Sequence, residues 1–169
     1  MIAGIGTDIV YIPRFYKIFI TKYQSNPRFV NKICSKFMHK VELAKMQKLQ
    51  EAEIEQKTIS NTTKVPLHII YAAGVWSVKE AIYKSLDLDE KAEVDKDKGQ
   101  KVPTLFLFSS IFYKSNNTSG KPIINLDANH LEAACVSPGL RSQILRSKFH
   151  LSISHDKDYL VSHVVREVA

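Results

Sequence analysis

Hydrophobic and polar positions alternate at the start of the chain and then change to a helical period. Residues 2 to 10 alternate around two glycines and predict a first strand, with Ile5 and Ile9 on one face and Asp8 on the other. After Asn26-Pro27, apolar side chains recur at roughly helical spacing at Val30, Ile33, Phe37 and Val41. The pattern therefore predicts a strand followed by a helical layer.

The clearest helical pattern follows Pro66. Its apolar and small side chains form one stripe that we expect to be buried: Leu67, Ile70, Tyr71, Gly74, Val78, Ala81, Ile82 and Ser85. The side chains of Trp76, Lys79, Glu80 and Lys84 are predicted to lie opposite this stripe. The helix should therefore have one core-facing side and one polar side.

Two polar segments interrupt the apolar pattern. Residues 51 to 66 lose apolar content and predict a mobile connection. Residues 87 to 102 are highly charged and of low complexity, which predicts a flexible loop. We interpret both segments as insertions in a single domain that spans residues 1 to 169.

Strand patterns dominate the C-terminal half. Residues 104 to 113 are aromatic and aliphatic and predict a buried strand, which a turn joins to a second strand at residues 123 to 126. A short helix is expected at residues 129 to 135, and a hairpin from strands 149 to 154 and 160 to 168. Together these elements predict an α+β fold in which an antiparallel sheet packs against helices.

Composition narrows the class of protein. The chain has 44% hydrophobic and 24% charged residues, typical of one soluble domain with a core, and its apolar stretches are too short to predict a transmembrane segment. The two cysteines, Cys34 and Cys135, have no paired spacing, so neither a zinc site nor a disulfide framework is expected. The first residues read as a strand and not as a secretory signal.

The charge pattern favours an anionic partner. The formal net charge is +7, which nucleic acid, a membrane surface, a phosphorylated ligand or an acidic protein could each explain. The positive field should be strongest near the N-terminus, because no acid lies between Asp8 and Glu42. Seven basic residues occupy that interval: Arg14, Lys17, Lys22, Arg28, Lys32, Lys36 and Lys40.

Three acidic or basic side chains could carry chemistry. Glu80 and Lys84 are four residues apart and share one helix face, which an ordinary surface ion pair would also explain. Asp8 follows Gly4 and Gly6, so it is either a solvated acid beside a tight packing contact or a carboxylate offered to magnesium where a ligand approaches closely. The residues alone leave both alternatives open.

Two further sequence features are weaker indications of a functional site. His150, Ser152 and Ser154 alternate to one face of a predicted strand, which suits either a polar edge strand or a histidine-bearing site. The tripeptide Gly120 to Pro122 predicts a turn that happens to contain Lys121.

These features occur in the same order as four sequence blocks of the holo-acyl-carrier-protein synthase family of 4′-phosphopantetheinyl transferases, which the chain resembles. The blocks are IAGIGTDIVYIPRF with Asp8 and Arg14, WSVKEAIYKS with Glu80 and Lys84, NTSGKPIINL, and HLSISHDKDYLVSHVV. Among family members, small fungal mitochondrial proteins are the most similar in appearance. Residues 51 to 66, 87 to 102 and 136 to 147 look like additions to a compact bacterial-type enzyme.

The resemblance implies the 4′-phosphopantetheinyl transferase fold and a magnesium-dependent reaction. The enzyme would transfer 4′-phosphopantetheine from coenzyme A to a serine of an apo-acyl carrier protein, and would release 3′,5′-ADP. It also implies a homotrimer with active sites between subunits. The mitochondrial matrix is the expected location, with the cytoplasm as the alternative.

The resemblance also assigns roles to individual residues. Asp8 and Glu80 would bind magnesium, and Glu80, or failing that His150, would be the general base. Lys84 would stabilise the departing phosphate charge, and Arg14 would contact the acidic carrier protein. The expected coenzyme A contacts are Lys79, Lys84, Gly120, Lys121, Pro122, His150 and Ser152.

One departure and two rival interpretations remain at this point. Bacterial relatives often carry arginine just before the aromatic residue of the helix motif, where this chain has Val75. The net charge could instead indicate a nucleic-acid-binding module, although no recognised nucleic-acid-binding motif is visible. Alternatively, the chain could be a non-catalytic interaction subunit. Because the resemblance to the transferase family rests on four ordered blocks, we expect neither a nucleic-acid nor a membrane partner.

Overall fold

The computed structural model describes residues 1–25, 27–57, 65–88, 104–133 and 136–168. Within these ranges the side chains of residues 21–29, 54–57 and 133 are not described. Cys135 and most of the two predicted insertions therefore lie outside the described residues.

Two antiparallel sheets form the β part of the fold. Strands β1 (Ile2–Tyr11), β5 (Tyr159–Val168) and β4 (Ser147–Asp156) pair in the order β1-β5-β4. Strands β2 (Phe112–Asn116) and β3 (Pro122–Leu126) form a separate hairpin. The first strand, the C-terminal hairpin and the α+β class are thus confirmed.

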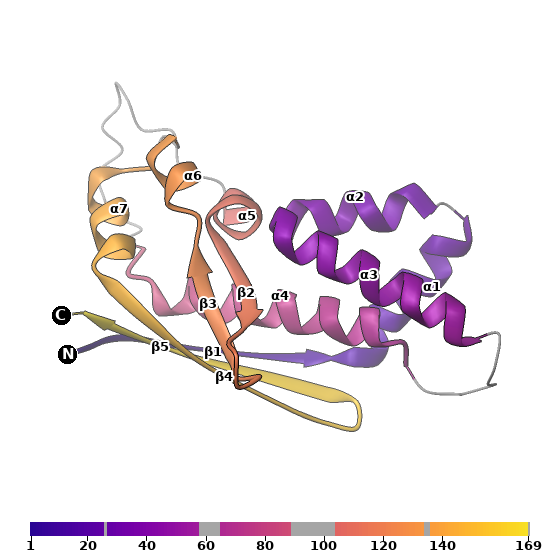
Figure 1. The fold of residues 1–169 in the computed structure, drawn as a ribbon. Helices are drawn as coiled ribbons and strands as arrows, with labels where there is room; N and C mark the ends of the chain where they lie inside the picture. Colours follow the sequence, from indigo (N-terminus) through magenta and orange to yellow (C-terminus); the bar gives the residue numbers. More distant parts are fainter. Residues whose placement is uncertain (26, 58–64, 89–103, 134–135, 169) are drawn as a thin grey trace.

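Helix α4 (Leu67–Ser85) lies along the inner face of the larger sheet (Figure 1). Helices α1 (Ile12–Ser25), α2 (Pro27–Phe37) and α3 (Lys40–Lys57) gather at one end of the molecule. The β2–β3 hairpin and the short helices α6 (Ala128–Ala133) and α7 (Pro138–Leu145) lie toward the other end, near both termini. No described helix has the length and apolar character that crossing a bilayer requires.

Two predicted element boundaries are wrong. Residues 51 to 57 continue α3, because Glu, Ala, Gln and Lys all favour helix even where few side chains are apolar. Residues 104 to 111 form the helical turn α5 (Thr104–Phe106) and the π-helical turn η1 (Leu107–Ile111), so the strand begins only at Phe112. Periodicity cannot distinguish a short buried helix from a buried strand.

Helix α4 is buried on nearly all sides, which the single predicted stripe did not anticipate. The sheet covers one side and α1 and α3 cover others, so that Ile69, Ala72, Val75 and Lys79 are all fully buried. Leu67, which was expected in the stripe, is 59% exposed. A helix at the centre of a small domain loses the two-sided pattern that marks a surface helix.

Strand β1 lies directly on the backbone of α4. A Cβ atom added to Gly6 would lie 1.9 Å from the carbonyl oxygen of Ala81, and one added to Gly4 would lie 2.0 Å from that of Ser85. Any other residue would therefore push the strand away from the helix. Buried Arg166 also fastens this contact, because it donates to the carbonyl oxygens of Ser85 and Ala3, each at 2.8 Å.

Candidate active site

Asp8 and Lys84 meet where β1 crosses α4. The Lys84 Nζ atom lies 2.8 Å from Asp8 Oδ1 and also donates to the carbonyl oxygen of Thr7 at 3.1 Å. Two turns earlier on the same face of α4, the hydroxyl of Ser77 donates to the backbone oxygen of Asp8 at 3.3 Å. The glycine contact described above therefore brings these remote residues together.

Glu80 lies in the electrostatic field of the same pair. Partial burial raises the pKa of Glu80, the negative charge of Asp8 raises it further, and Lys84 opposes both effects. The Asp8 carboxylate is thus close enough to disfavour the ionisation of Glu80. The cluster of Asp8, Glu80 and Lys84 contains two carboxyl groups and a single ammonium group, so with both carboxyl groups ionised it carries an excess of negative charge.

This cluster fits a divalent cation. Asp8 Oδ2 is buried and has no hydrogen-bond partner among the described residues, which is costly for a carboxylate oxygen. Magnesium prefers such hard oxygen donors and commonly takes one or two carboxylates, leaving its other positions to phosphate and water. Among the described residues no three His, Cys, Asp or Glu side chains are arranged to hold a metal, and the cluster contributes two carboxylates, those of Asp8 and Glu80.

The structure does not bring Lys79 to this site, so its predicted position beside Glu80 is wrong. Its Nζ atom lies 2.9 Å from Glu42 Oε2, and it donates to the carbonyl oxygens of Phe108, at 2.6 Å, and Phe112. These three contacts use all the protons of the ammonium group, and both charged side chains are 0% exposed. Burial lowers the pKa of Lys79, whereas the negative charge of Glu42 acts to raise this pKa.

Glu42 is a buried charge that the sequence reasoning missed. Besides Lys79, it accepts hydrogen bonds from the backbone N–H groups of His39 at 2.9 Å and Lys114 at 2.6 Å. The bond to His39 closes the first turn of α3, and a Glu three residues after the helix cap is a recognisable sequence signal for it. Glu42 thereby joins α3, α4 and the β2–β3 hairpin.

His150 and Ser152 lie on the opposite face of the larger sheet from Asp8. The predicted alternation along β4 is confirmed, with His150 and Ser152 exposed and Leu151 buried. His150 Nε2 lies 2.8 Å from Glu167 Oε2, an ion-pair contact that lowers the pKa of Glu167. One protomer therefore does not unite His150 with Asp8 and Glu80.

The turn at Gly120 forms as predicted, at the tip of the β2–β3 hairpin. Gly120 has φ +82°, a conformation that favours glycine, and Asn117 Oδ1 accepts the backbone N–H of Lys121 at 2.9 Å. Lys121 is exposed, and Arg14 is exposed on α1. No described contact joins these residues to Asp8, Glu80 or Lys84.

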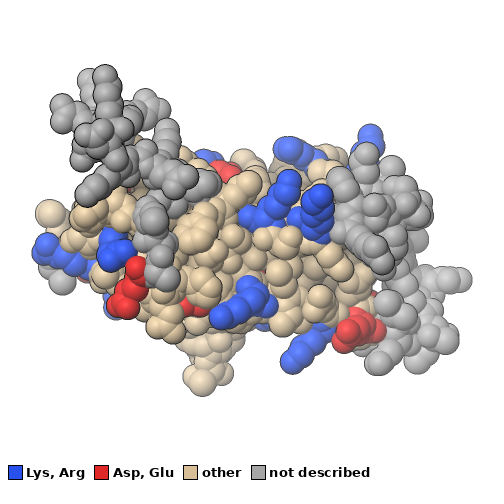
Figure 2. Space-filling model, turned by 90° about the horizontal axis from the view of Figure 1, so that it is seen from above, with Lys and Arg blue, Asp and Glu red and all other residues tan. Residues whose placement is uncertain are grey.

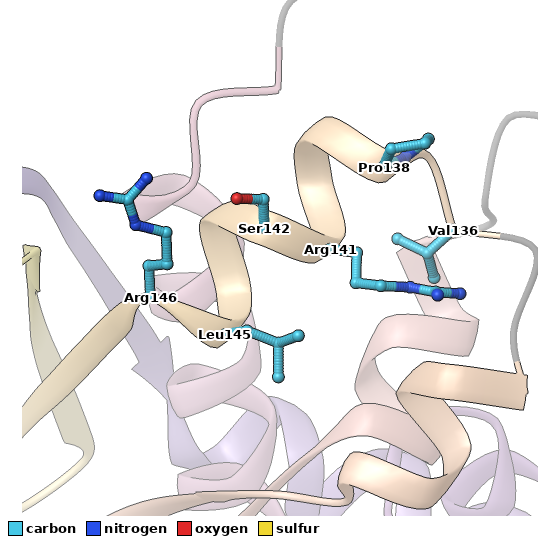
Figure 3. Close-up of a pocket in the computed structure, with 6 residues that line it drawn as sticks. All are labelled: Val136, Pro138, Arg141, Ser142, Leu145 and Arg146. Carbon is cyan, nitrogen blue, oxygen red and sulfur yellow. The ribbon is translucent and has the colours of Figure 1, made fainter.

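A separate cavity of about 450 Å³ lies over α7 (Figure 3). None of the predicted site residues lines it. Its lining comes from the segment that we interpreted as an addition, and consists of Val136, Pro138, Arg141, Ser142, Leu145 and Arg146. The carboxylate cluster is therefore not enclosed by this cavity.

Comparison with known proteins identifies the family of this chain. A profile of the 4′-phosphopantetheinyl transferase superfamily matches residues 4–125. The mitochondrial holo-[acyl-carrier-protein] synthase of Saccharomyces cerevisiae is 32% identical over 169 residues, which cover 95% of this chain and 89% of the relative. The protein of the same name from Candida glabrata is 28% identical over 163 residues, which cover 96% of this chain and 92% of the relative.

Solved structures show the same fold. A holo-(acyl-carrier-protein) synthase from Bacillus anthracis, solved in complex with CoA (3′,5′-ADP), matches with a TM-score of 0.58 and 22% identity. That match covers 100% of this chain and 99% of the other. The holo-ACP-synthase of Plasmodium yoelii matches with a TM-score of 0.56, also at 22% identity, covering 100% of this chain and 97% of that one. The fold predicted from the sequence is thereby confirmed.

The pKa of Glu80 provides a test of the carboxylate cluster that does not depend on activity. We expect NMR titration of carboxyl-labelled protein to place this pKa above the ordinary value of 4.5. Asp8→Asn should lower the Glu80 pKa because it removes a neighbouring negative charge, and Lys84→Gln should raise it further. Since only the deprotonated carboxylate binds metal, magnesium affinity should fall as pH decreases through this pKa. A Glu80 pKa that is unchanged by Asp8→Asn would show that the two carboxylates do not interact.

Proposed function

This chain belongs to the 4′-phosphopantetheinyl transferase superfamily, and we propose that it transfers 4′-phosphopantetheine from coenzyme A to a serine of an apo-acyl carrier protein. The observation that carries the proposal is the cluster of Asp8, Glu80 and Lys84 where β1 crosses α4. The names of the two yeast relatives support the choice of carrier protein as acceptor.

The reaction requires charge neutralisation more than covalent catalysis. The serine hydroxyl oxygen attacks the phosphorus that bears the pantetheine arm, and the bond from this phosphorus to 3′,5′-ADP breaks. Glu80 is our first choice to accept the serine proton, because its raised pKa makes it a stronger base than an ordinary glutamate. His150 is the second choice. Lys84 is placed to stabilise the negative charge that develops on the departing phosphate.

Asp8 and Glu80 would hold magnesium, which when bound would neutralise charge on the pyrophosphate oxygens. Without a cation, the two carboxylates would repel a diphosphate as well as each other. This requirement explains why a site for an anionic substrate contains acidic side chains at all. His150, Ser152 and the turn from Gly120 to Pro122 would hold the adenosine end of coenzyme A.

The outward face of the larger sheet supports a homotrimer. Four large apolar side chains are strongly exposed on this face: Ile5 at 60%, Ile9 at 63%, Tyr11 at 47% and Tyr159 at 52%. A contiguous exposed apolar surface of this kind usually marks an interface. His150 and Ser152 lie on the same outward face. Contact between subunits at this face would place His150 in the interface between them.

Basic side chains on the helical layer suit an acidic carrier protein. Figure 2 looks down on this layer and shows Lys and Arg spread more widely than Asp and Glu. Arg14, Lys17, Lys32 and Lys36 are exposed on α1 and α2. Complementary charge of this kind accelerates encounter and fixes orientation. The mitochondrial yeast relatives support a location in the mitochondrial matrix, where the enzyme would modify the local carrier protein.

Glu80→Gln tests the proposed reaction, because it removes one ligand charge without changing side-chain size. Purified protein is incubated with coenzyme A, magnesium and apo-carrier protein, and mass spectrometry detects the added pantetheine arm. We expect the variant to lose about 100-fold or more in turnover while it unfolds at the temperature of the parent protein. Exposed Glu51→Gln is the matched control and should retain full activity. Near-parental transfer by Glu80→Gln would contradict the role assigned to this residue.

Ile9→Glu tests the trimer. The parent chain, of 19.2 kDa, should elute with three times this mass in size-exclusion chromatography with light scattering. Charges placed in an apolar interface are costly, so the variant should be monomeric and inactive. Val41→Glu changes an exposed apolar residue of α3 and should leave both mass and activity unchanged. A fully active monomer would exclude a site shared between subunits.

A further inference from the structure

Two buried polar atoms that have no hydrogen-bond partner among the described residues lie on adjacent strands of the larger sheet. One is Oδ2 of Asp8 on β1, and the other is the hydroxyl oxygen of Ser162 on β5. The register of the sheet pairs these two residues directly across the strands. Ser162 is 0% exposed. Buried polar atoms are rarely left without a partner, so two of them side by side call for an explanation.

Both side chains project from the face of the sheet that α4 covers. Gly6, two residues before Asp8, lies against the backbone of α4. Leu160, two residues before Ser162, lies against Gly74 of the same helix. Side chains two residues apart on a strand share a face. Residues that lie directly opposite on one face have Cβ atoms about 4.5–5.5 Å apart, which is within reach of a hydroxyl and a carboxylate.

The other neighbours of Ser162 on this face of the sheet are apolar. Ile153 of β4 lies opposite it on the second side, and Leu160 and Val164 flank it along β5. Among these four neighbours, Asp8 has the only polar side chain. A serine hydroxyl can donate one hydrogen, whereas an ionised carboxylate oxygen only accepts, so the two unpartnered atoms are complementary. Rotation of the serine between its staggered positions moves the hydroxyl without moving the backbone.

A hydrogen bond from Ser162 would hold the part of Asp8 that other contacts leave free. Lys84 lies 2.8 Å from Oδ1, and the hydroxyl of Ser77 donates to the backbone oxygen of Asp8. Neither contact reaches Oδ2, and the torsion that turns a carboxylate is broad. A carboxylate oxygen has about two acceptor positions, so Oδ2 can accept the hydroxyl hydrogen and still face a cation. Carboxylates that bind metal are commonly hydrogen-bonded in this way.

We propose that Ser162 is a positioning residue for the cation site, because its hydroxyl donates to Asp8 Oδ2 and fixes the direction in which this oxygen meets magnesium. This inference rests on the proposed function, which supplies the cation that Asp8 and Glu80 would share. Ser162 touches neither the substrate nor the reacting atoms. Its loss should therefore weaken metal binding and leave the chemical step unchanged once the metal is saturating.

Three substitutions separate the effect of the hydroxyl from the effect of side-chain shape. Ser162→Ala deletes the hydroxyl, whereas Ser162→Thr and Ser162→Val introduce side chains of the same β-branched shape, of which only threonine has a hydroxyl. Manganese, a paramagnetic substitute for magnesium, is titrated into the intact chain with coenzyme A present, and electron paramagnetic resonance measures the free ion. We expect Ser162→Ala and Ser162→Val to bind manganese about tenfold more weakly than the parent protein, and Ser162→Thr to bind it as the parent does.

Turnover provides a second measurement. In Ser162→Ala the magnesium concentration for half-maximal transfer should rise by the same factor, with kcat at saturating magnesium unchanged. A serine with no role toward Asp8 predicts another result, because removal of an unpartnered buried hydroxyl is neutral or stabilising and leaves the magnesium requirement as it was. The matched control is Ser147→Ala at the far end of the sheet, whose hydroxyl donates to the carbonyl oxygen of Gln143. Its manganese affinity should equal that of the parent protein.

Parental manganese affinity in Ser162→Ala, or an equal loss in Ser162→Thr and Ser162→Val, would overturn the proposal. If thermal unfolding shows that Ser162→Ala is not folded, the comparison of threonine with valine decides. A parent protein that binds manganese but transfers no pantetheine would refute the proposed function, whereas the manganese comparison would still decide the role of Ser162. A parent protein that binds no manganese with coenzyme A present would refute both the cation site and this role.

Discussion

The contact between the backbones of β1 and α4 is the constraint on which the site depends. Gly4 and Gly6 have no Cβ atoms, so the strand can lie against the carbonyl oxygens of Ser85 and Ala81. At this separation Asp8, two residues beyond Gly6, lies within ion-pair distance of Lys84. Because the contact forms between backbones, it fixes the height of the Asp8 carboxylate above the helix more firmly than flexible side chains could.

Charged side chains are distributed unevenly around α4. The charge of Asp8 raises the pKa of Glu80 on one side, while Lys45 and Lys114 lie over the ring of Tyr71 without a described carboxylate as ion-pair partner. The buried pair of Glu42 and Lys79 is neutral as a whole and holds α3, α4 and the hairpin in place between them. His150 lies on the outward face of the sheet, together with the exposed side chains of Ile5 and Ile9.

The parts of the site that local pattern determines could be predicted from the sequence, and the parts that depend on tertiary packing could not. Strand alternation separated Asp8 from Ile5 and Ile9 on β1 and His150 from Leu151 on β4, and helical spacing placed Glu80 beside Lys84. That Asp8 and His150 lie on opposite faces of the sheet follows from the pairing register, which alternation within one strand does not determine. The same spacing misplaced Lys79, because α4 is surrounded by other elements and its apparent polar face meets buried Glu42. The cluster at Tyr71 combines three distant segments, and no local period reports such an encounter.

Anomalous diffraction from crystals grown with coenzyme A and manganese in place of magnesium tests the central claim most directly. A single manganese peak is expected with an oxygen of Asp8 and an oxygen of Glu80 both about 2.1 Å away, and with its remaining positions filled by phosphate and water. A peak bound by other residues, or coenzyme A bound with no metal between these two carboxylates, would contradict the account.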